Sequence, residues 1–280
     1  MSRPRVRKSR PPAGSLVVVG TGIRAARHTT LEAREEMRAA QKLFYLTTDP
    51  VSERWIRSTN ASAESLAGCY RTGESRAIAY ERMVDKILRA VRSGRNVCGA
   101  FYGHPGVFVL PSHEAIRRSR AEGWPARMVP GISAEDCLFA DLGIDPARSG
   151  CQSFEATDLL VHRRRFDPSS ALLIWQAGLV GRSEFRRRFS KTALAALGRR
   201  LGRAYGARHP VVLYEASAFS AFEPIVRTTT IAELSSAALN GRTTLFLPPK
   251  PRNPDPAVLH ELRISTRDAA RAGPCWQSGA

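Results

Sequence analysis

Long apolar runs, paired cysteines and acidic residues are all scarce in this sequence. No apolar run approaches the ~18–20 residues that a membrane-spanning helix needs. The five cysteines form no Cys-x-x-Cys pair, which argues against structural zinc and a disulfide framework and favours a reducing cytoplasm. Asp and Glu number 25 against 43 Lys and Arg, so the net charge is +18. This imbalance favours partners that carry negative charge.

The excess positive charge is concentrated in two segments. The first ten residues hold five basic residues and no acidic one, and no apolar segment of a secretory signal follows them. Residues 163–208 hold twelve basic residues against two acidic ones, Asp167 and Glu184. Such segments attract nucleic acid or an acidic protein segment. Compositional bias on solvated helix faces explains the same charge equally well.

Short β-branched runs alternate with helical segments in the first half of the chain. The expected strands there cover residues 16–19, 43–46, 96–102 and 126–129. The expected helices cover residues 29–41, 76–92 and 111–122. This alternation predicts a mainly parallel sheet with helices on both faces.

The pattern changes after residue 145. Further strands are expected at residues 171–175, 211–214 and 244–247, and a short helix near 257–263. We therefore predict two α/β domains. The expected segments are a basic tail (1–13), an N-terminal domain (14–129), a C-terminal domain (130–250) and an extension (251–280).

A glycine motif follows the first expected strand. Residues 20–25 match the G-x-G-x-x-A fingerprint of a dinucleotide-binding turn. The fingerprint also requires an acidic residue after the second strand, and the nearest one, Asp49, stands late, in a Thr-Asp-Pro turn. A phosphate-binding turn and a tight turn without a phosphate are both open.

Two more strands end in loops with polar side chains. Residues 102–108 combine two glycines and a proline with Tyr102 and His104, at the edge where open α/β sheets bind ligands. Residues 130–136 form a second turn before a helix, where Ser133 suits an N-cap and the two acids that follow suit the helix dipole.

These loops carry a specific resemblance. The blocks FYGHPGVFVLPSH (101–113) and MVPGISAEDCLFADLGIDP (128–146) resemble the borosin peptide backbone α-N-methyltransferases. That family is a branch of the tetrapyrrole methylase superfamily, whose members use S-adenosylmethionine (SAM). The similarity runs from about Gly14 to Lys250. It implies two α/β domains of the tetrapyrrole methylase type, SAM in the cleft between the domains, and an interlocked homodimer.

The resemblance also assigns site residues. Arg76 matches the family's catalytic arginine, and Tyr70 and Tyr80 match its two key tyrosines, whereas another family tyrosine is replaced by Ala67. The implied SAM contacts are Tyr102, His104, Val107, Ala134, Gln176, Ala216, Thr243 and Thr244. No metal is expected. His104 stands where many relatives carry aspartate, which favours the peptide-methylating branch over corrin chemistry.

The chemistry of amide methylation explains why such residues are needed. A backbone amide nitrogen is a poor nucleophile because its lone pair is delocalised into the carbonyl. Its proton must be removed and the charge on the oxygen stabilised. Arg76 and Tyr80 are four residues apart and share a helix face, and a guanidinium beside a phenol favours the phenolate. We expect Tyr80 to be the base, Arg76 to stabilise charge and Tyr70 to orient the amide.

The substrate is expected to be a separate peptide. Fungal members of the family carry the peptide on the same chain, whereas residues 273–280 lack its run of Val, Ile and Gly. We expect a split enzyme that acts in trans on a ribosomally made precursor. Because opposite charges speed encounter, we expect an acidic leader that docks on residues 163–208, with Arg186, Arg187 and Arg188 as the main contacts.

Two other functions remain open from the sequence. The first is methylation of a tetrapyrrole, of diphthine or of ribosomal RNA, all found in the superfamily. The second is nucleic-acid binding by an inactive methylase fold. The intact Tyr70, Arg76, Tyr80 and His104 argue against an inactive fold. Residues 163–208 contain few aromatic platforms for bases, so nucleic acid is not an expected partner. A membrane is not expected either, because no apolar run is long enough to cross one.

Overall fold

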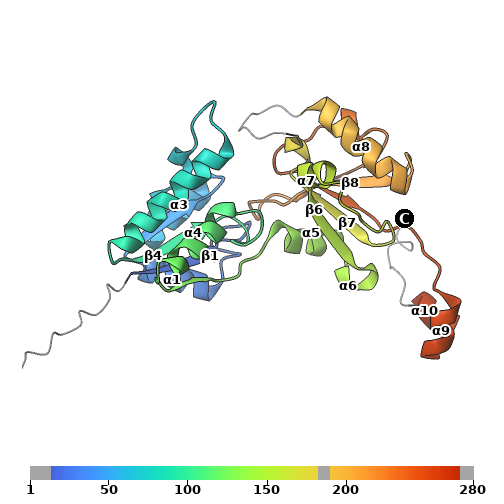
Figure 1. Ribbon diagram of the computed structural model, residues 1–280, viewed down its shortest axis with the longest axis horizontal. Helices are drawn as coiled ribbons and strands as arrows, with labels where there is room; N and C mark the ends of the chain where they lie inside the picture. Colours follow the sequence, from blue (N-terminus) through green and yellow to red (C-terminus); the bar gives the residue numbers. More distant parts are fainter. Residues whose placement is uncertain (1–13, 182–189, 272–280) are drawn as a thin grey trace, which may run out of the picture. The chain divides into compact units, whose positions relative to one another are not determined.

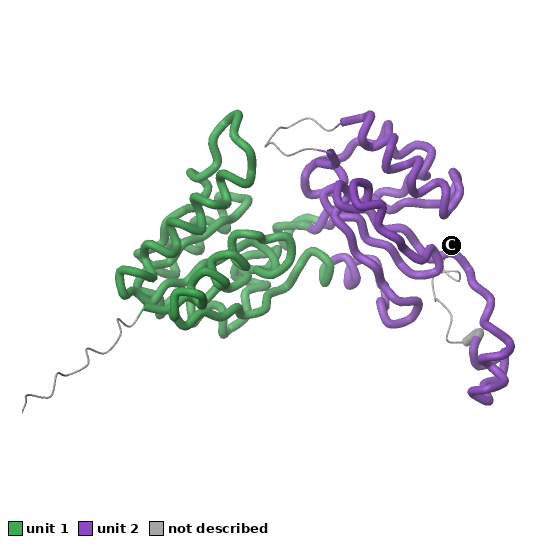
Figure 2. The backbone as a smooth tube through the Cα atoms, in the orientation of Figure 1, with its two compact units in different colours: residues 1–137, 217–222 green, residues 138–216, 223–280 purple. Residues whose placement is uncertain are grey.

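The computed structural model describes residues 14–181 and 190–271 (Figure 1). The chain forms two compact units, coloured separately in Figure 2. Unit 1 contains residues 1–137 and 217–222, and unit 2 contains residues 138–216 and 223–280. No helix in the described parts is long and apolar enough to cross a membrane. The basic tail and the triplet Arg186–Arg188 lie outside the described residues.

Unit 1 is built on a parallel five-stranded sheet, as the sequence predicts. The strands are β1 (Ser15–Gly20), β2 (Lys42–Leu46), β3 (Glu64–Ser65), β4 (Asn96–Phe101) and β5 (Ala126–Met128). Their order is β3-β2-β4-β1-β5, and every neighbouring pair is parallel. All five carboxyl ends therefore meet at one edge of the sheet, where α/β proteins place their ligands.

Helices cover both faces of this sheet. They are α1 (Leu31–Ala39), α2 (Pro50–Thr59), α3 (Arg76–Arg92) and α4 (Leu110–Ala121), with the 3-10 turn η1 (Ala67–Cys69) before α3. One apolar core joins α3 and α4 to the sheet through Leu16 and Val18. Another joins α1 and α2 to the opposite face through Val19. Successive residues of β1 thus serve opposite faces, which explains its uninterrupted apolar run.

Helix α3 begins and ends where the sequence predicts. Ser75 caps it by accepting a hydrogen bond from the backbone N–H of Ile78, and Met83, Ile87 and Val91 are buried at helical spacing. The sequence pattern does not predict helix α2, because Asp49-Pro50 indicates only the end of a strand. In the structure Asp49 caps α2 and Pro50 is its first residue.

Unit 2 has a mixed sheet. Its strands are β6 (Cys151–Glu155), β7 (Ala171–Trp175), β8 (Pro210–Glu215), β9 (Ile225–Thr230) and β10 (Thr244–Leu247), in the order β6-β7-β10-β8-β9. Only β6 and β7 are parallel, and the other neighbours are antiparallel. The expected strands at residues 171–175, 211–214 and 244–247 are confirmed, whereas β6 and β9 were not predicted.

Helices α7 (Ala156–Val161) and α8 (Lys191–Tyr205) pack on one face of this sheet through a single apolar core. Ser190 caps α8, and Leu194, Leu197, Leu201 and Tyr205 form its buried side. The remaining elements are α5 (Ala134–Leu142), α6 (Pro146–Ser149), η2 (Ala177–Leu179), η3 (Leu234–Ser236), α9 (Pro256–Leu262) and α10 (Thr266–Arg271).

Candidate active site

Three turns at the carboxyl edge of the unit 1 sheet pack backbone against backbone. The N–H of Gly22 donates to the carbonyl of Gly103 at 3.2 Å, and the N–H of Gly103 donates back at 3.1 Å. A Cβ on Gly131 would lie 2.9 Å from Gly20 Cα and 3.0 Å from Gly103 O, so only glycine fits there. Helix α1 begins at Leu31, well after the motif. The geometry therefore favours the tight-turn interpretation of residues 20–25 over a dinucleotide fingerprint, in which the helix follows directly.

The loop after β4 fixes the orientation of His104. The backbone N–H of Gly106 donates to His104 Nδ1 at 2.9 Å. Because Nδ1 accepts this bond, the neutral imidazole carries its proton on Nε2. The first turn of α4 holds the loop, since the Ser112 hydroxyl donates to the carbonyl of Pro105 and His113 Nε2 donates to that of Gly106 at 2.8 Å. His104 is therefore a preoriented donor at the sheet edge.

The backbone of the same loop is unusual at Phe108. Phe108 has a φ of 56°, a left-handed conformation that residues other than glycine seldom adopt, and the residue is 47% exposed. Tyr102 is half-buried at the start of the loop, with its N–H bonded to the carbonyl of Leu46. Backbone strain of this kind concentrates at ligand-binding sites.

The turn before α5 is held by a capping box. The Ser133 hydroxyl accepts from the backbone N–H of Asp136 at 3.2 Å, and Asp136 Oδ2 accepts from the Ser133 N–H at 2.6 Å. The expected N-cap is thus confirmed. Ala134, the implied SAM contact, follows it. Burial, and then the charge of Asp136, raises the pKa of the neighbouring Glu135.

The structure brings Tyr70, Arg76 and Tyr80 together at the start of α3. The rings of Tyr70 and Tyr80 meet edge to face, with centroids 6.3 Å apart. Burial raises the pKa of Tyr70, its hydrogen bond and charge interaction with Tyr80 raise it further, and the charge of Arg76 opposes the rise. Tyr70 is therefore a neutral phenol at physiological pH, which suits a donor rather than a base.

A carboxylate clamp fixes the loop that carries Tyr70. Glu74 forms a bidentate ion pair with Arg82 in the second turn of α3, with Arg82 Nη2 and Glu74 Oε1 2.9 Å apart. Arg82 also donates to the carbonyl of Cys69 at 3.4 Å. The hydrogen bonds from Arg82 lower the pKa of Glu74, which keeps the clamp ionised. Ala67, which replaces a family tyrosine, is exposed in η1 just before this loop.

In unit 2 the implied cofactor residues also stand at strand ends. Gln176 follows β7 with a left-handed φ of 54°. Thr243 is fully buried, and Thr244 begins β10. Ala216 follows β8 directly. Because β10 runs antiparallel to β7 and β8, its start lies at the same edge of the sheet as their ends, so these four residues lie along one edge of the unit 2 sheet.

Glu215 is a buried acid that the sequence analysis missed. Its Oε1 accepts hydrogen bonds from the Thr243 hydroxyl at 2.8 Å and from Asn240 Nδ2 at 2.7 Å. Its Oε2 is buried without a hydrogen-bond partner, 3.9 Å from Arg242 Nη2. The signal in the sequence was an acid at the end of an apolar strand, directly before Ala216. Glu215 Oε1 thus holds the segment that carries Thr243, whereas Oε2 accepts no hydrogen bond from the described residues.

Two pockets lie away from these residues. One of about 690 Å³ opens in unit 1 at the start of β1 and β5 beside Trp124, and another of about 510 Å³ lies along α8 in unit 2. Neither contains a residue expected to be catalytic or to bind SAM, and most of the lining of the second belongs to the basic segment 163–208. Within the described ranges, no three His, Cys, Asp or Glu side chains lie close enough to hold a metal ion.

The fold and these residues define a class: a two-sheet α/β protein with rigid strand-end turns and a phenol–guanidinium cluster suited to group transfer. The chain belongs to the tetrapyrrole (corrin/porphyrin) methylase family, whose model matches residues 15–235. This confirms the predicted fold class.

Its relatives include proteins that join a methyltransferase to a peptide precursor. The chain is 40% identical over 262 residues to the methyltransferase/ribosomally synthesized cyclic peptide gymnopeptides precursor of Gymnopus fusipes, covering 91% of this chain and 62% of that protein. It is 42% identical over 247 residues to the type I borosin precursor of Coprinopsis marcescibilis, covering 86% of this chain and 63% of that protein. The chain thus spans about 60% of the length of these relatives.

A solved structure shares the fold. Uroporphyrin-III-C-methyltransferase from Thermus thermophilus matches with a TM-score of 0.61 and 18% identity, over 84% of this chain and 92% of that one. At this identity the match shows the architecture alone.

Proposed function

We propose that the protein transfers methyl groups from SAM to backbone amide nitrogens of a ribosomally made peptide, and that the peptide is a separate chain. The observation that carries the proposal is the cluster of Tyr70, Arg76 and Tyr80 at the start of α3. The similarity to methyltransferase/peptide-precursor proteins at about 40% identity supports it.

The three residues divide the work that amide methylation requires. Tyr80 takes the amide proton, Arg76 stabilises the charge that develops on the carbonyl oxygen, and Tyr70 donates a hydrogen bond that orients the amide. Burial keeps Tyr70 protonated, which matches a donor role. The Glu74–Arg82 clamp holds the loop in place, so the groups are positioned before the peptide binds.

The residues of each unit fit the cofactor that the family implies. In unit 1 these are Tyr102, His104, Val107 and Ala134, and in unit 2 they are Gln176, Ala216, Thr243 and Thr244. In unit 1, His104 offers a donor at Nε2. In unit 2, Glu215 Oε2 accepts no hydrogen bond from the described residues and offers an acceptor for a hydroxyl or amino group such as adenosine carries. When bound, SAM supplies an electrophilic methyl group on its sulfonium.

A mass-spectrometric assay tests the reaction. The purified chain is incubated with SAM and a separate synthetic peptide whose core is rich in Val, Ile and Gly, and tandem spectra locate each added methyl. We expect methyl groups on backbone nitrogens. Methylation of uroporphyrinogen III or of an RNA in parallel reactions, with none on the peptide, would overturn the proposal. Modification of the peptide only when it is fused to the chain would overturn the separate-substrate part.

The proposal includes a homodimer, as the resemblance to the borosin enzymes implies. Light scattering coupled to gel filtration should give twice the mass of one chain. A mass that stays at one chain as the protein concentration rises would remove the dimer from the proposal.

A further inference from the structure

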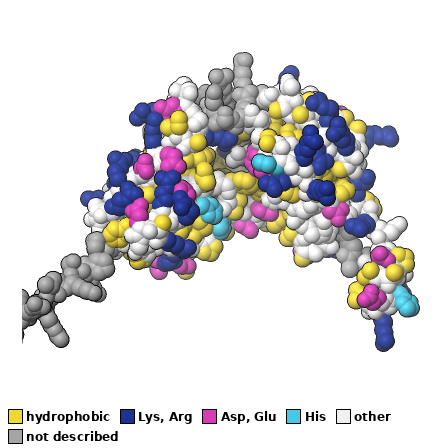
Figure 3. All heavy atoms as spheres, in the orientation of Figure 1, with side chains coloured by type: hydrophobic (Ala, Val, Ile, Leu, Met, Phe, Trp, Pro, Cys, Tyr) yellow, Lys and Arg dark blue, Asp and Glu magenta, His cyan; other side chains and the backbone are white. Residues whose placement is uncertain are grey.

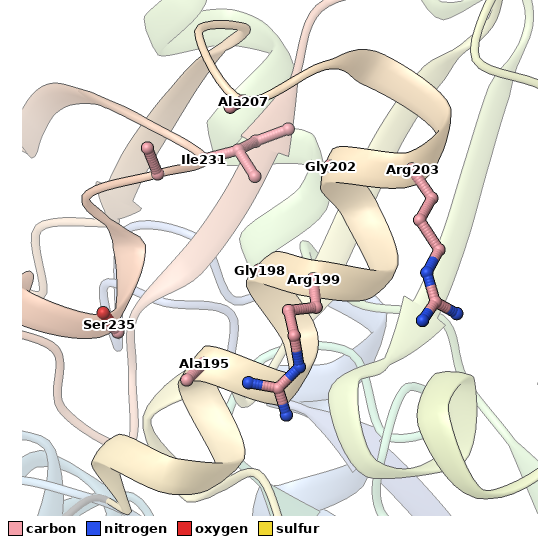
Figure 4. Close-up of a pocket in the computed structure, with 9 residues that line it drawn as sticks. Ala195, Gly198, Arg199, Gly202, Arg203, Ala207, Ile231 and Ser235 are labelled. Carbon is pink, nitrogen blue, oxygen red and sulfur yellow. The ribbon is translucent and has the colours of Figure 1, made fainter.

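Helix α8 turns a small-residue face toward the segment that follows β9. A Cβ on Gly198 would lie 3.3 Å from the carbonyl oxygen of Ile231, and one on Gly202 would lie 3.6 Å from Ile231 Cγ2. Each glycine costs a helix about 1 kcal/mol relative to alanine. The missing side chains leave a groove of about 510 Å³ with Ile231 in its lining and Ala195 and Ser235 at one end (Figure 4).

Two arginines border this groove and have no partner among the described residues. Arg199 and Arg203 are exposed and belong to its lining, and no hydrogen bond or ion pair engages either guanidinium within the described chain. They are four residues apart on α8, about 6 Å along the helix axis. Figure 4 shows both side chains extending from the helix.

The neighbouring charged groups are already engaged. Arg200 donates to the carbonyl of Arg164 and lies over the ring of Phe166, 4.8 Å from its centroid. Glu233, the acid in the segment beside the groove, accepts from the backbone and hydroxyl of Thr230. Helix α8 itself contains no acidic residue, and Figure 3 shows basic side chains gathered over it. The groove therefore has a positive border that the described residues do not neutralise.

We propose that this groove, the α8 groove, docks an acidic segment of the substrate peptide that lies outside the methylated core. A small apolar side chain of that segment fills the space over Gly198, Gly202 and Ile231. Two carboxylates about one helical turn apart pair with Arg199 and Arg203. That the partner is the substrate peptide rests on the proposed function. That the docked segment is acidic and carries a small apolar side chain rests on the groove alone.

The lining of the groove favours a peptide over nucleic acid. No aromatic residue lines it, whereas proteins that bind single-stranded RNA stack bases on aromatic rings. Its floor is apolar, and a phosphate backbone offers nothing to bury there. Two arginines beside an apolar floor match an amphipathic acidic segment instead.

A binding experiment on the full chain tests the proposal without any catalysis. The probe is a fluorescein-labelled 16-residue alanine-based peptide with Glu pairs and Leu at helical spacing, and its control has Gln for every Glu. Fluorescence anisotropy should show that Arg199→Glu/Arg203→Glu raises the Kd at least 10-fold. Ala195→Leu, which fills the groove without changing charge, should also weaken binding. The matched control is Arg34→Glu/Arg38→Glu, an exposed pair of the same spacing on α1, which should bind the probe like the parent.

Three results would overturn the proposal. The first is equal binding of the probe by the parent and the α8 double variant. The second is equal binding of the Glu and Gln peptides by the parent. The third is binding of a uridine 16-mer, but not of the peptide, that depends on Arg199 and Arg203.

A second assay joins the acidic segment to the peptide core and follows methylation. There the α8 double variant should raise KM rather than lower kcat. If no peptide is methylated by the parent but the probe still binds in the groove, the proposed function fails and the docking surface stands.

Discussion

Helices α3 and α8 cover their sheets in the same way but use their arginines differently. On α3, Arg82 pairs with Glu74, Lys86 with Glu64 at 2.6 Å, and Arg92 with Glu122 at 2.6 Å. On α8, Arg199 and Arg203 have no such partner in the described residues. Both helices bury leucine and other apolar side chains against their own sheet. The comparison separates basic residues that complete the fold from basic residues that are left for another molecule.

The two helices differ in ion pairing because acidic residues lie near the basic residues of α3, whereas α8 contains none. Near α3, Glu74 pairs with Arg82 and Glu64 of β3 pairs with Lys86, and Glu81 on the helix pairs with Arg118 of α4, so several of its charges are satisfied within the chain. Helix α8 lacks acids altogether. High net charge alone therefore does not locate a docking surface. The informative residues are cations without an internal partner.

The largest effect is expected when the proposed catalytic groups on α3 are removed. Tyr80→Phe removes the proposed proton acceptor and Arg76→Ala removes the charge, so each should lower kcat by about 10²–10⁴-fold. Calorimetry should show that both variants still bind SAM. Arg89→Ala, an exposed arginine on the same helix, is the control. A Tyr80→Phe variant that methylates at the parent rate would show that the base is another group.

The next effect concerns the clamp on the Tyr70 loop. Glu74→Ala frees Arg82 and loosens the loop, so kcat should fall by about 10–100-fold while the Kd for SAM stays within twofold. Glu74→Gln keeps hydrogen bonding to Arg82 and should recover part of the loss. Equal activity of the alanine variant and the parent would show that the loop is held by its backbone alone.

Glu215 tests whether a buried carboxylate that holds neighbouring side chains also matters in unit 2. Glu215→Ala leaves the buried Thr243 hydroxyl and the Asn240 amide without their acceptor, at about 1–3 kcal/mol for each unsatisfied group. We expect the Kd for SAM to rise about 10-fold by calorimetry. Glu215→Gln retains one acceptor oxygen and should stay within about threefold. If the alanine variant binds SAM as the parent does, Thr243 does not depend on this brace.

The smallest effect is on stability. Arg92→Ala breaks an exposed pair and should lower Tm by at most about 2–4 °C, whereas Arg203→Ala breaks none and should stay within about 1 °C. The hydrogen bond from Arg92 lowers the pKa of Glu122, so the pair contributes above the ordinary pKa of a glutamate and is lost as the pH falls through the lowered value. The Tm gap between the parent and Arg92→Ala should therefore close in acid. If Arg203→Ala lowers Tm as much as Arg92→Ala does, Arg203 stabilises the fold and the contrast between α3 and α8 is wrong.

The sequence predicted the elements whose pattern is local. Helix α3 has caps and a regular apolar face, and β10 is an apolar run closed by Pro248, so their limits could be predicted. Strand β9 could not, because it is an exposed edge strand without alternating burial. Glu215 was missed because its partners, Asn240 and Thr243, are distant in sequence and meet it only through the pairing of β8 with β10. The triplet Arg186–Arg188, where the sequence predicts that a leader docks, lies outside the described residues, and the α8 groove depends on contacts that no local pattern reveals.

The short segment 217–222 has a consequence for dividing this protein. It belongs to unit 1, although the chain on both sides of it belongs to unit 2. Arg24 Nε donates to the carbonyl of Ser217 at 3.2 Å, and Phe219 and Phe222 meet edge to face within the segment. A gene cut after residue 137 would therefore yield a first fragment that lacks part of its own structure. Independent production of the two units requires a rearranged gene in which residues 217–222 are joined by a linker to the first fragment.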